Sequence, residues 1–150
     1  MQHTKQSACL GIVLAALAAC GAKQPQTGKP GGLSPRDSLQ VMRKLAQIAG
    51  QANQAAPADV DENTRLDGAQ AGPGLKLTSR YTLVNSKAQG VDSTIFQTKL
   101  TPAIKEASCG NSELRPLIDQ GVVVVLEYRG SDGKPIGTIS LDRDSCTAAR

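Results

Sequence analysis

The residues Leu17-Ala18-Ala19-Cys20 close an apolar run near the start of the chain and limit what can fold after it. The run covers residues 8–19, which is 12 residues, whereas a helix that crosses a membrane needs about 20. A short polar segment, residues 1–7, precedes the run. This pattern is typical of an export signal, so we expect the folded part to begin after Cys20 and to lie in an oxidising compartment.

The cysteine that ends the apolar run predicts lipidation. A leucine three positions before Cys20, with alanines between them, is the arrangement of a lipoprotein signal peptide, and Cys9 lacks it because Gln6 precedes it by three. Gly21 follows, where an aspartate would favour the inner membrane, so we expect an outer-membrane protein that faces the periplasm. Two acyl chains make such an anchor stable. The alternative is ordinary secretion without lipid, cut after Ala16-Leu17-Ala18.

Changes in composition divide the chain into parts. Glycine, proline, lysine and glutamine dominate the segment after Cys20, which is the composition of a flexible linker. The rest is long enough for one domain. The predicted parts are a lipoprotein signal peptide (1–19), a tether (20–34), an N-terminal helix (35–56), an α+β domain (57–146) and a tail (147–150).

The composition argues against several classes of function. The single histidine, His3, lies in the signal peptide, so the exported part lacks the residue that Ser-His-Asp catalysis, Cys-His catalysis and most zinc sites require. The 17 basic and 13 acidic residues are interspersed, without the basic runs of a nucleic-acid-binding protein. One Phe, two Tyr and no Trp give little material for stacking on bases or sugars. We therefore expect a protein without enzymatic activity, cofactor, metal or nucleic-acid partner.

Cys109 and Cys146 are the cysteines that remain after the signal peptide and the lipidation site. In an oxidising compartment such a pair predicts a structural disulfide. A redox-active pair would more usually be spaced C-x-x-C, which these two are not.

Ser34-Pro35 predicts a helix start, with serine as N-cap and proline at the first helical position. Apolar residues then recur at helical spacing. This helix either packs on the domain or presents itself to a partner. The expected buried stripe contains Leu39, Met42, Leu45, Ala46 and Ala49, widened by Val41 and Ile48.

The middle of the chain predicts a β-hairpin and then a helix. Alternating residues on both sides of Gly72-Pro73-Gly74 predict the hairpin over residues 59–85. Residues 91–108 predict a helix capped by Asp92 or Ser93. Its expected buried stripe consists of Phe96, Leu100, Ala103, Ile104 and Ala107. Pro102 either kinks this helix or starts a second one behind Thr101. The β-branched residues near its start leave a strand as the alternative; they are Thr94, Ile95 and Thr98.

The last third predicts a second hairpin. A short helical turn through Leu114, Leu117 and Ile118 ends at Gly121. Residues 122–129 and 135–141 then form two strands around the Asp132-Gly133 turn. The fold class is α+β, in the order α-β-β-α-(α)-β-β. We expect an antiparallel sheet of about four strands, made of two hairpins, with helices on one face and no need for a parallel crossover.

In several sequence features, the chain resembles a group of small uncharacterised bacterial envelope lipoproteins. The shared features are Val60-Asp61-Glu62-Asn63-Thr64-Arg65-Leu66-Asp67, Gly72-Pro73-Gly74, Tyr81-Thr82-Leu83-Val84-Asn85, the hairpin after Gly121, and the pair Cys109 and Cys146. The resemblance covers about residues 57–146 and implies a compact α+β domain with one disulfide. It brings no established activity. The group's first hairpin is more aromatic than this one, which has Ser79 and Arg80 there.

Asp61, Arg65 and Asp67 belong to the densest polar cluster. Strand spacing places the three on one face. Acid–base catalysis would need a carboxylate with a raised pKa in an apolar cleft, and a calcium loop would need a different spacing of oxygen ligands. Neither pattern is met, so we expect a salt-bridged polar patch.

These observations favour a lipid-anchored outer-membrane protein that binds or assembles an envelope protein. One alternative is a pilot lipoprotein that escorts a secretion channel and grips a partner helix in an apolar groove between the first helix and the sheet. Another is an envelope enzyme inhibitor that projects a rigid loop, residues 87–92 or 130–134. The remaining alternative is a histidine-free enzyme built on Asp61, Arg65 and Asp67.

Overall fold

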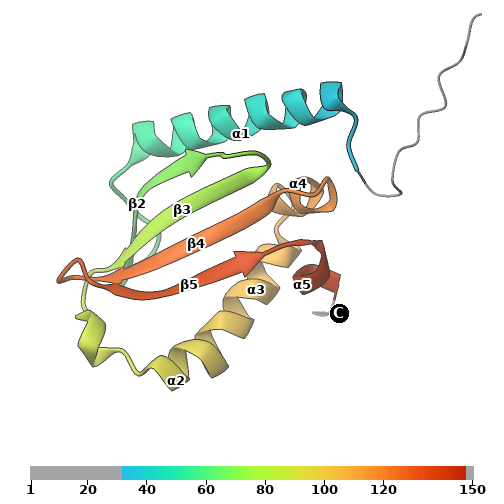
Figure 1. Cartoon of the computed structure of the whole chain (residues 1–150). Coiled ribbons are helices and arrows are strands. Elements are labelled where there is room, and N and C mark those ends of the chain that lie inside the picture. The colour runs from blue at the N-terminus through green and yellow to red at the C-terminus, as the bar shows by residue number, and fades with distance from the viewer. Residues whose placement is uncertain (1–31, 148–150) are drawn as a thin grey trace, which may run out of the picture.

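A computed structural model describes residues 32–147 (Figure 1). The predicted signal peptide, the lipidation site Cys20 and most of the tether lie outside the described residues, as does the tail after Thr147. These expectations therefore stay predictions. Between residues 32 and 147, no helix combines the length and the apolar character that crossing a membrane would take.

The N-terminal helix α1 spans Pro35–Ala55 and lies along the β2 side of the sheet (Figure 1). Its start is the one that the sequence predicts. The Ser34 side chain accepts a hydrogen bond from the Asp37 backbone N–H at 3.2 Å, and Pro35 occupies the first turn, where a helix does not need its missing N–H.

The buried side of α1 differs from the predicted stripe. Val41, Leu45 and Ala49 are buried, whereas Leu39 is 53% exposed and Ala46 is exposed as well. The stripe is rotated toward Val41 because α1 packs over β2. Leu39 and Ala46 were wrongly placed in the core, since helical spacing alone defines a band of residues without saying which edge of it meets the sheet.

An asparagine fastens α1 to the sheet. The Asn53 side-chain amide donates to the Ala69 carbonyl and its oxygen accepts from the Ala69 N–H, both at 2.8 Å. The neighbouring Gly68 has a φ of 149°, and a β-carbon there would lie 2.7 Å from the Asn53 Oδ1. Glycine is therefore required for this close approach. Of the two roles predicted for this helix, packing on the domain is the one that the structure has.

The sheet has five strands in the order β1-β2-β3-β4-β5, so the predicted α+β class is confirmed. The predicted hairpins are β2 with β3 and β4 with β5, and β1 is an additional short strand that pairs with β2. The strands span Ala58–Asp59 (β1), Thr64–Ala71 (β2), Lys76–Leu83 (β3), Val123–Gly130 (β4) and Pro135–Leu141 (β5).

The two hairpins join through a parallel pair, which corrects the expected all-antiparallel sheet. Leu77 of β3 stands opposite Val124 of β4, and the register continues to Leu83 and Gly130. A parallel pair requires the chain to cross back over the sheet before the second strand begins. The helical segment between β3 and β4 makes this crossover (Figure 1).

That segment is helical almost throughout. It consists of a 3-10 turn η1 (Ala88–Gly90), helix α2 (Ser93–Ile95), a π-helical stretch η2 (Phe96–Leu100), helix α3 (Thr101–Gly110) and helix α4 (Leu114–Asp119). The Asp92 side chain caps α2, as predicted, and the strand alternative is wrong. The wider π turn lies directly before Pro102, whose ring and missing N–H disturb ordinary helical hydrogen bonding.

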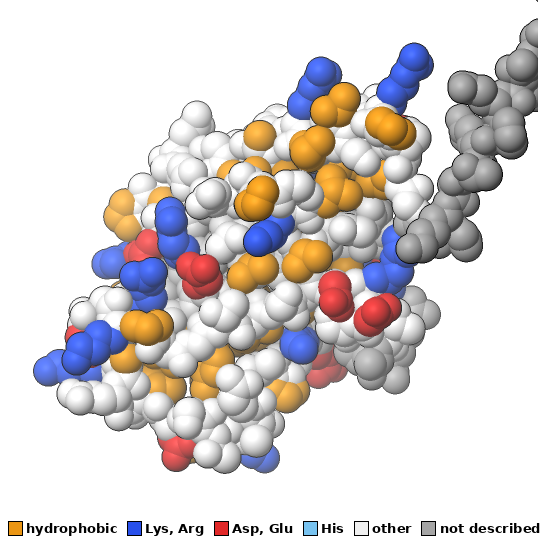
Figure 2. All heavy atoms as spheres, viewed as in Figure 1, with side chains coloured by type: hydrophobic (Ala, Val, Ile, Leu, Met, Phe, Trp, Pro, Cys, Tyr) orange, Lys and Arg blue, Asp and Glu red, His pale blue; other side chains and the backbone are white. Residues whose placement is uncertain are grey.

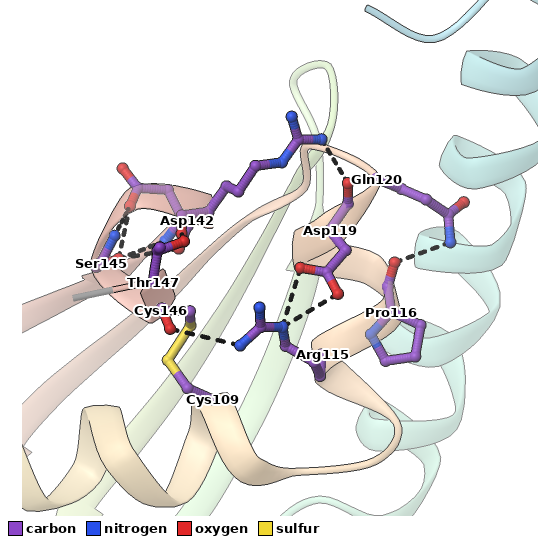
Figure 3. A network of polar contacts seen from close by, with 10 residues as sticks. Cys109, Arg115, Pro116, Asp119, Gln120, Asp142, Ser145, Cys146 and Thr147 are labelled. Carbon is purple, nitrogen blue, oxygen red and sulfur yellow. Dashed lines mark hydrogen bonds and ion pairs between the residues drawn. A yellow bond between two sulfur atoms is a disulfide. The ribbon is translucent and has the colours of Figure 1, made fainter. Parts of the chain in front are cut away.

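The disulfide joins the end of α3 to the short C-terminal helix α5, Arg143–Thr147 (Figure 3). The Cα atoms of Cys109 and Cys146 lie 5.4 Å apart, and both residues are buried. Arg115 of α4 donates to the Asp119 carboxylate at 2.9 Å and to the Cys146 carbonyl at 3.4 Å. Cross-link and ion pair together hold α3, α4 and α5 as one layer.

The buried apolar side chains of β3, β4 and β5 occupy alternate positions and face the same side. They are Leu77, Val124, Leu126, Ile139 and Leu141, and they form one core with residues of α1, α3, α4 and α5. The helices therefore form a single layer on one face, as predicted. The other face of the sheet is uncovered (Figure 1). We call these the helical face and the open face.

Candidate functional site: an apolar groove on the helical face

An apolar groove of about 360 Å³ lies between the sheet and the segment that runs from η2 into α3. Strands β2, β3 and β4 form its floor, η2 and α3 form one wall, and Leu114 of α4 closes one end. The loop between β1 and β2 lies at the other end. The residues that line the apolar groove are Val60, Asp61, Thr64, Tyr81, Leu83, Phe96, Leu100, Ile104, Ser108, Leu114, Leu126 and Tyr128.

The groove gathers every aromatic residue of the chain, two on its floor and one on its wall. The rings of Tyr81 and Tyr128 stack with centroids 5.3 Å apart, and Phe96 meets Tyr128 edge-on at 5.8 Å. The sequence contains one Phe and two Tyr, and all three belong to this cluster. The low aromatic content that the composition indicates is therefore concentrated in one place, where aromatic rings contribute large contact areas to binding.

A glycine in β5 makes room for this cluster. A β-carbon on Gly137 would overlap the Phe96 ring, so no other residue fits there without moving the ring. Phe96 is almost fully buried against this backbone. Gly137 thus determines how closely the start of the groove wall approaches the sheet.

The rim of the groove exposes large apolar side chains. Val60 is 59% exposed at the mouth and Leu100 is 41% exposed on the wall. Apolar side chains gathered around a concave surface mark sites that bind a partner or ligand more often than scattered ones do. The groove therefore has a largely apolar floor and rim, and Asp61 is the charged residue of its lining.

Burial changes the acid–base properties of both tyrosines. Burial raises the pKa of Tyr128 to about 12, with smaller contributions from Tyr81 and from the Asp61 carboxylate. Burial likewise raises the pKa of Tyr81. Both phenols are therefore neutral at physiological pH, and the floor of the groove carries no charge.

The position of the groove differs from the position that we expected from the sequence. We expected a groove between the first helix and the sheet, but none of the residues that line this one comes from α1. Phe96, Leu100 and Ile104 were predicted to belong to a buried stripe, and of these three only Phe96 is buried, while Leu100 is 41% exposed. What spacing could not show is that Leu100 stays exposed, because that depends on how far η2 stands from the strands.

The predicted polar patch is divided between the two faces. Arg65 and Asp67 lie on β2 and form an ion pair, Nε to Oδ1, of 2.9 Å. Asp61 instead lies in the β1–β2 loop, where it lines the groove and accepts from the Asn63 N–H at 2.8 Å. Placing all three on one face was wrong, because β2 begins only at Thr64 and strand spacing does not apply before it.

Asp67 lacks the property that an acid catalyst needs. Partial burial would raise the pKa of Asp67, but hydrogen bonds from Thr82 and Arg65, together with the charges of Arg65 and Arg80, outweigh this and lower it. General acid catalysis would require the opposite shift. Nor do residues 32–147 bring three or more potential metal-binding side chains together.

The two loops proposed for an inhibitor support each other at one end of the sheet. The Ala88 N–H donates to the Asp132 carboxylate at 3.1 Å, and the Ser131 N–H donates to the Ser86 carbonyl at 2.8 Å. The loops therefore brace each other, and whether either of them inhibits an enzyme stays a prediction.

Comparison with known proteins finds similarity only in three dimensions. No protein-family model matches the chain. No curated protein matches it either. Among solved structures, the fold is similar to the pilotin EpsS of the Vibrio vulnificus type 2 secretion system, with a TM-score of 0.62 and 16% identity over 75% of this chain and 97% of that one.

Two further structures have the same fold. One is the type II secretion system pilotin AspS of Vibrio cholerae, with a TM-score of 0.59 and 13% identity over 74% of this chain and 96% of that one. The other is the Pseudomonas aeruginosa protein PA3611, thought to be secreted, with a TM-score of 0.61 and 17% identity over 77% of this chain and 99% of that one. At these identities the likeness concerns the fold.

Proposed function

We propose that this protein is a lipid-anchored pilot protein of the bacterial outer membrane, without enzymatic activity, that binds a component of a secretion channel. Three lines of support agree. The sequence predicts a lipoprotein signal at Cys20, the fold is similar to two type II secretion pilotins, and the helical face carries an apolar groove.

The groove is the observation on which the proposal depends. Amphipathic helices bind to proteins by inserting apolar side chains, spaced along one face, into grooves of this kind. Here the partner's side chains would contact the Tyr81–Tyr128 stack, and Val60 and Leu100 would close over them from the rim. The neutral phenols add contact area without a buried charge.

A crosslinking experiment tests the identity of the partner. A photo-reactive phenylalanine analogue replaces Leu100 in cells that produce the lipid-anchored chain, and mass spectrometry identifies the adduct. We expect the channel component of a secretion system. The same analogue at Gln97, an exposed residue of η2 outside the groove lining, is the matched control and should give little of that product.

A broader hypothesis than the pilot function is that this protein binds an envelope protein outside any secretion channel. A reproducible Leu100 adduct with an envelope protein that is not part of a secretion channel would support this hypothesis and contradict the pilot function. Adducts that are the same from Leu100 and Gln97 would contradict the use of the groove.

Two rim substitutions test the binding surface itself. Leu100→Asp and Val60→Asp should each weaken binding of the purified partner at least ten-fold, because each places a charge against an apolar contact. Both side chains are largely exposed, so thermal melting should change little. Ile95→Asp is the matched control, since Ile95 is 54% exposed, between Val60 and Leu100, but lies on α2 outside the groove lining. Equal losses in all three would contradict the proposal.

The lipid anchor needs a separate test. Cells fed a palmitate analogue should label the wild-type chain and not the Cys20→Ser variant. An unlabelled wild type would favour ordinary secretion, cut at Ala16-Leu17-Ala18.

A further inference from the structure

We infer that the outer side of α1 is a second contact surface, which rests on an anionic phospholipid bilayer. The surface consists of Arg36, Leu39, Met42, Arg43 and Ala46, and we call it the α1 strip. The inference goes beyond the proposed function, because any bilayer-anchored chain could use such a strip. It does rest on the predicted lipid anchor.

The α1 strip is one continuous surface. Arg36, Leu39, Arg43 and Ala46 follow one another at spacings of three or four residues, and Met42 lies three residues after Leu39 and four before Ala46, which brings them together on one side of a helix. Arg36, Leu39, Arg43 and Ala46 are exposed, and Met42 is partly exposed. Figure 2 shows apolar side chains along α1 with basic side chains projecting beside them.

Charge is distributed unevenly along α1, and its sign favours an anionic surface. The basic residues Arg36, Arg43 and Lys44 all lie in the first half of the helix, whereas residues 45–55 carry no charge. The acidic residue of α1 is Asp37, whose carboxylate accepts from the Ser34 hydroxyl at 2.7 Å at the helix start. Each basic side chain near an anionic bilayer strengthens binding roughly five-fold.

The place of the α1 strip in the chain brings it to the membrane. It begins two residues after Ser34, and Ser34 follows the predicted lipidation site Cys20 by only 14 positions. A linker with the composition of residues 21–33 spans about 20 Å on average. The α1 strip itself is about 15 Å long, from the rise of an α-helix. The anchor would thus hold these side chains within reach of the headgroups at all times, so that even weak contacts are occupied.

An interfacial helix needs an apolar side and flanking basic residues, and the α1 strip has both on a small scale. Leu39 and Met42 would enter the headgroup region, while Arg36 and Arg43 would contact phosphates beside them. None of these residues lines the apolar groove. The chain could therefore hold the bilayer with α1 and a protein partner in the groove at the same time.

A tryptophan reporter tests the inference directly, because the chain contains no Trp. The Leu39→Trp chain is purified from membranes with its anchor and placed in vesicles of phosphatidylcholine alone or with 30% phosphatidylglycerol, each containing a brominated lipid that quenches tryptophan on contact. We expect quenching at least two-fold stronger in the anionic vesicles. High salt should reduce it.

Two comparisons make the result decisive. Adding Arg36→Gln and Arg43→Gln to the reporter chain should return quenching to the level in neutral vesicles. A Gln97→Trp chain, with its reporter on η2, should be quenched weakly in both vesicle types. Equal quenching of the Leu39→Trp chain in both vesicle types, or no effect of the arginine substitutions, would overturn the inference.

Two other outcomes also count against it. Failure of the chain to attach to any vesicle would overturn the inference, because the α1 strip would then not be held at a bilayer. The tryptophan of the Leu39→Trp chain could instead become inaccessible to a water-soluble quencher only after a channel protein is added. That result would assign the α1 strip to a protein contact. Loss of channel binding by Leu100→Asp tests the groove and is independent of all these results.

Discussion

The two faces of the sheet are made by the same strands and differ in chemistry. Toward the helices, β3 and β4 contribute Leu77, Tyr81, Leu126 and Tyr128 to the core and to the groove. Toward solvent, the same two strands present Lys76, Thr78, Arg80 and Thr82 from β3, and Val123, Val125, Glu127 and Arg129 from β4. Figure 2 looks onto the sheet and shows charged side chains of both signs spread over it.

This difference follows from the alternation of side chains along a strand. It indicates which face of the sheet could recognise a specific partner. On the open face, charged residues are solvated or locally paired, as Arg65 is with Asp67. On the helical face, the helical layer covers the core only in part and leaves the groove between η2, α3 and the strands. An incomplete cover over an apolar floor is what leaves an apolar groove in this fold.

The largest effect should come from opening the disulfide, which belongs to the helical layer alone. Its loop spans 37 residues, and closing such a loop stabilises the folded state by about 4 kcal/mol in the chain-entropy model. We expect urea unfolding under strong reductant to show a loss of this order. Cys146→Ala should also make residues 143–147 and the end of α3 sensitive to protease. An unchanged unfolding midpoint after reduction would contradict the stabilising role.

The next largest effect should come from replacing a glycine on the helical face. Gly137→Ala should destabilise the protein by about 1–3 kcal/mol, because the new methyl group overlaps the Phe96 ring and the groove wall must move. It should also weaken partner binding. Thermal melting and a binding titration measure the two effects.

The control for this substitution is Gly50→Ala in α1, where a β-carbon meets nothing within 4 Å. Alanine favours a helix over glycine, so this change should stabilise the protein by about 0.5–1 kcal/mol. The same chemical change should thus have opposite signs at the two sites. Stabilisation by Gly137→Ala would show that Phe96 is not held as described.

A smaller effect is expected from the open face. Asp67→Asn should cost about 1 kcal/mol at neutral pH, because it removes the carboxylate that accepts from Thr82 and Arg65. The folded state lowers the pKa of Asp67, so its contribution is present above the ordinary pKa near 4 and is lost as the pH falls through the folded value. The difference between variant and wild type in melting temperature should therefore shrink between pH 5 and pH 2. A constant difference would contradict the charge-dependent role.

The smallest effect at neutral pH concerns the floor of the groove. Both tyrosines are neutral at that pH, so Tyr128→Phe should change the free energy of unfolding little. In a spectrophotometric titration, Tyr128 should ionise near its raised pKa of about 12. The unfolded chain ionises near 10, so the folded state should lose stability as the pH rises from about 10 to 12. Tyr128→Phe should remove the upper ionisation step, and a normal titration of both phenols would contradict their burial.

Much of the local structure could be predicted from the sequence because its causes are local. Ser34-Pro35 set the start of α1, Asp92 capped α2, and the Asp132-Gly133 turn placed β4 beside β5. Period-two alternation identified the strands, and the pairing of Cys109 with Cys146 is present in the structure. The recurrence of Phe96, Leu100 and Ile104 at helical spacing identified the segment that became the groove wall.

The candidate site could be predicted only in part. For a pilot protein we expected an apolar groove between the first helix and the sheet, whereas the groove found here does not contact α1. Asp61 was grouped with Arg65 and Asp67, although β2 starts after it. The edge of the α1 stripe was also misjudged, because Leu39 and Ala46 lie beyond the contact with the sheet.

By itself, then, the sequence determined most of the helices and strands, though not β1 or α5, together with most of their ends and the apolar character of one face of the sheet. These properties depend on caps, turns and spacings within a few residues. The tertiary structure alone decided that β3 and β4 run parallel, and this register is what stacks Tyr81 on Tyr128 and opens the groove beneath Leu100. The helical segment between the hairpins could have returned the chain to either end of β3, and only packing across the whole layer selects one of them.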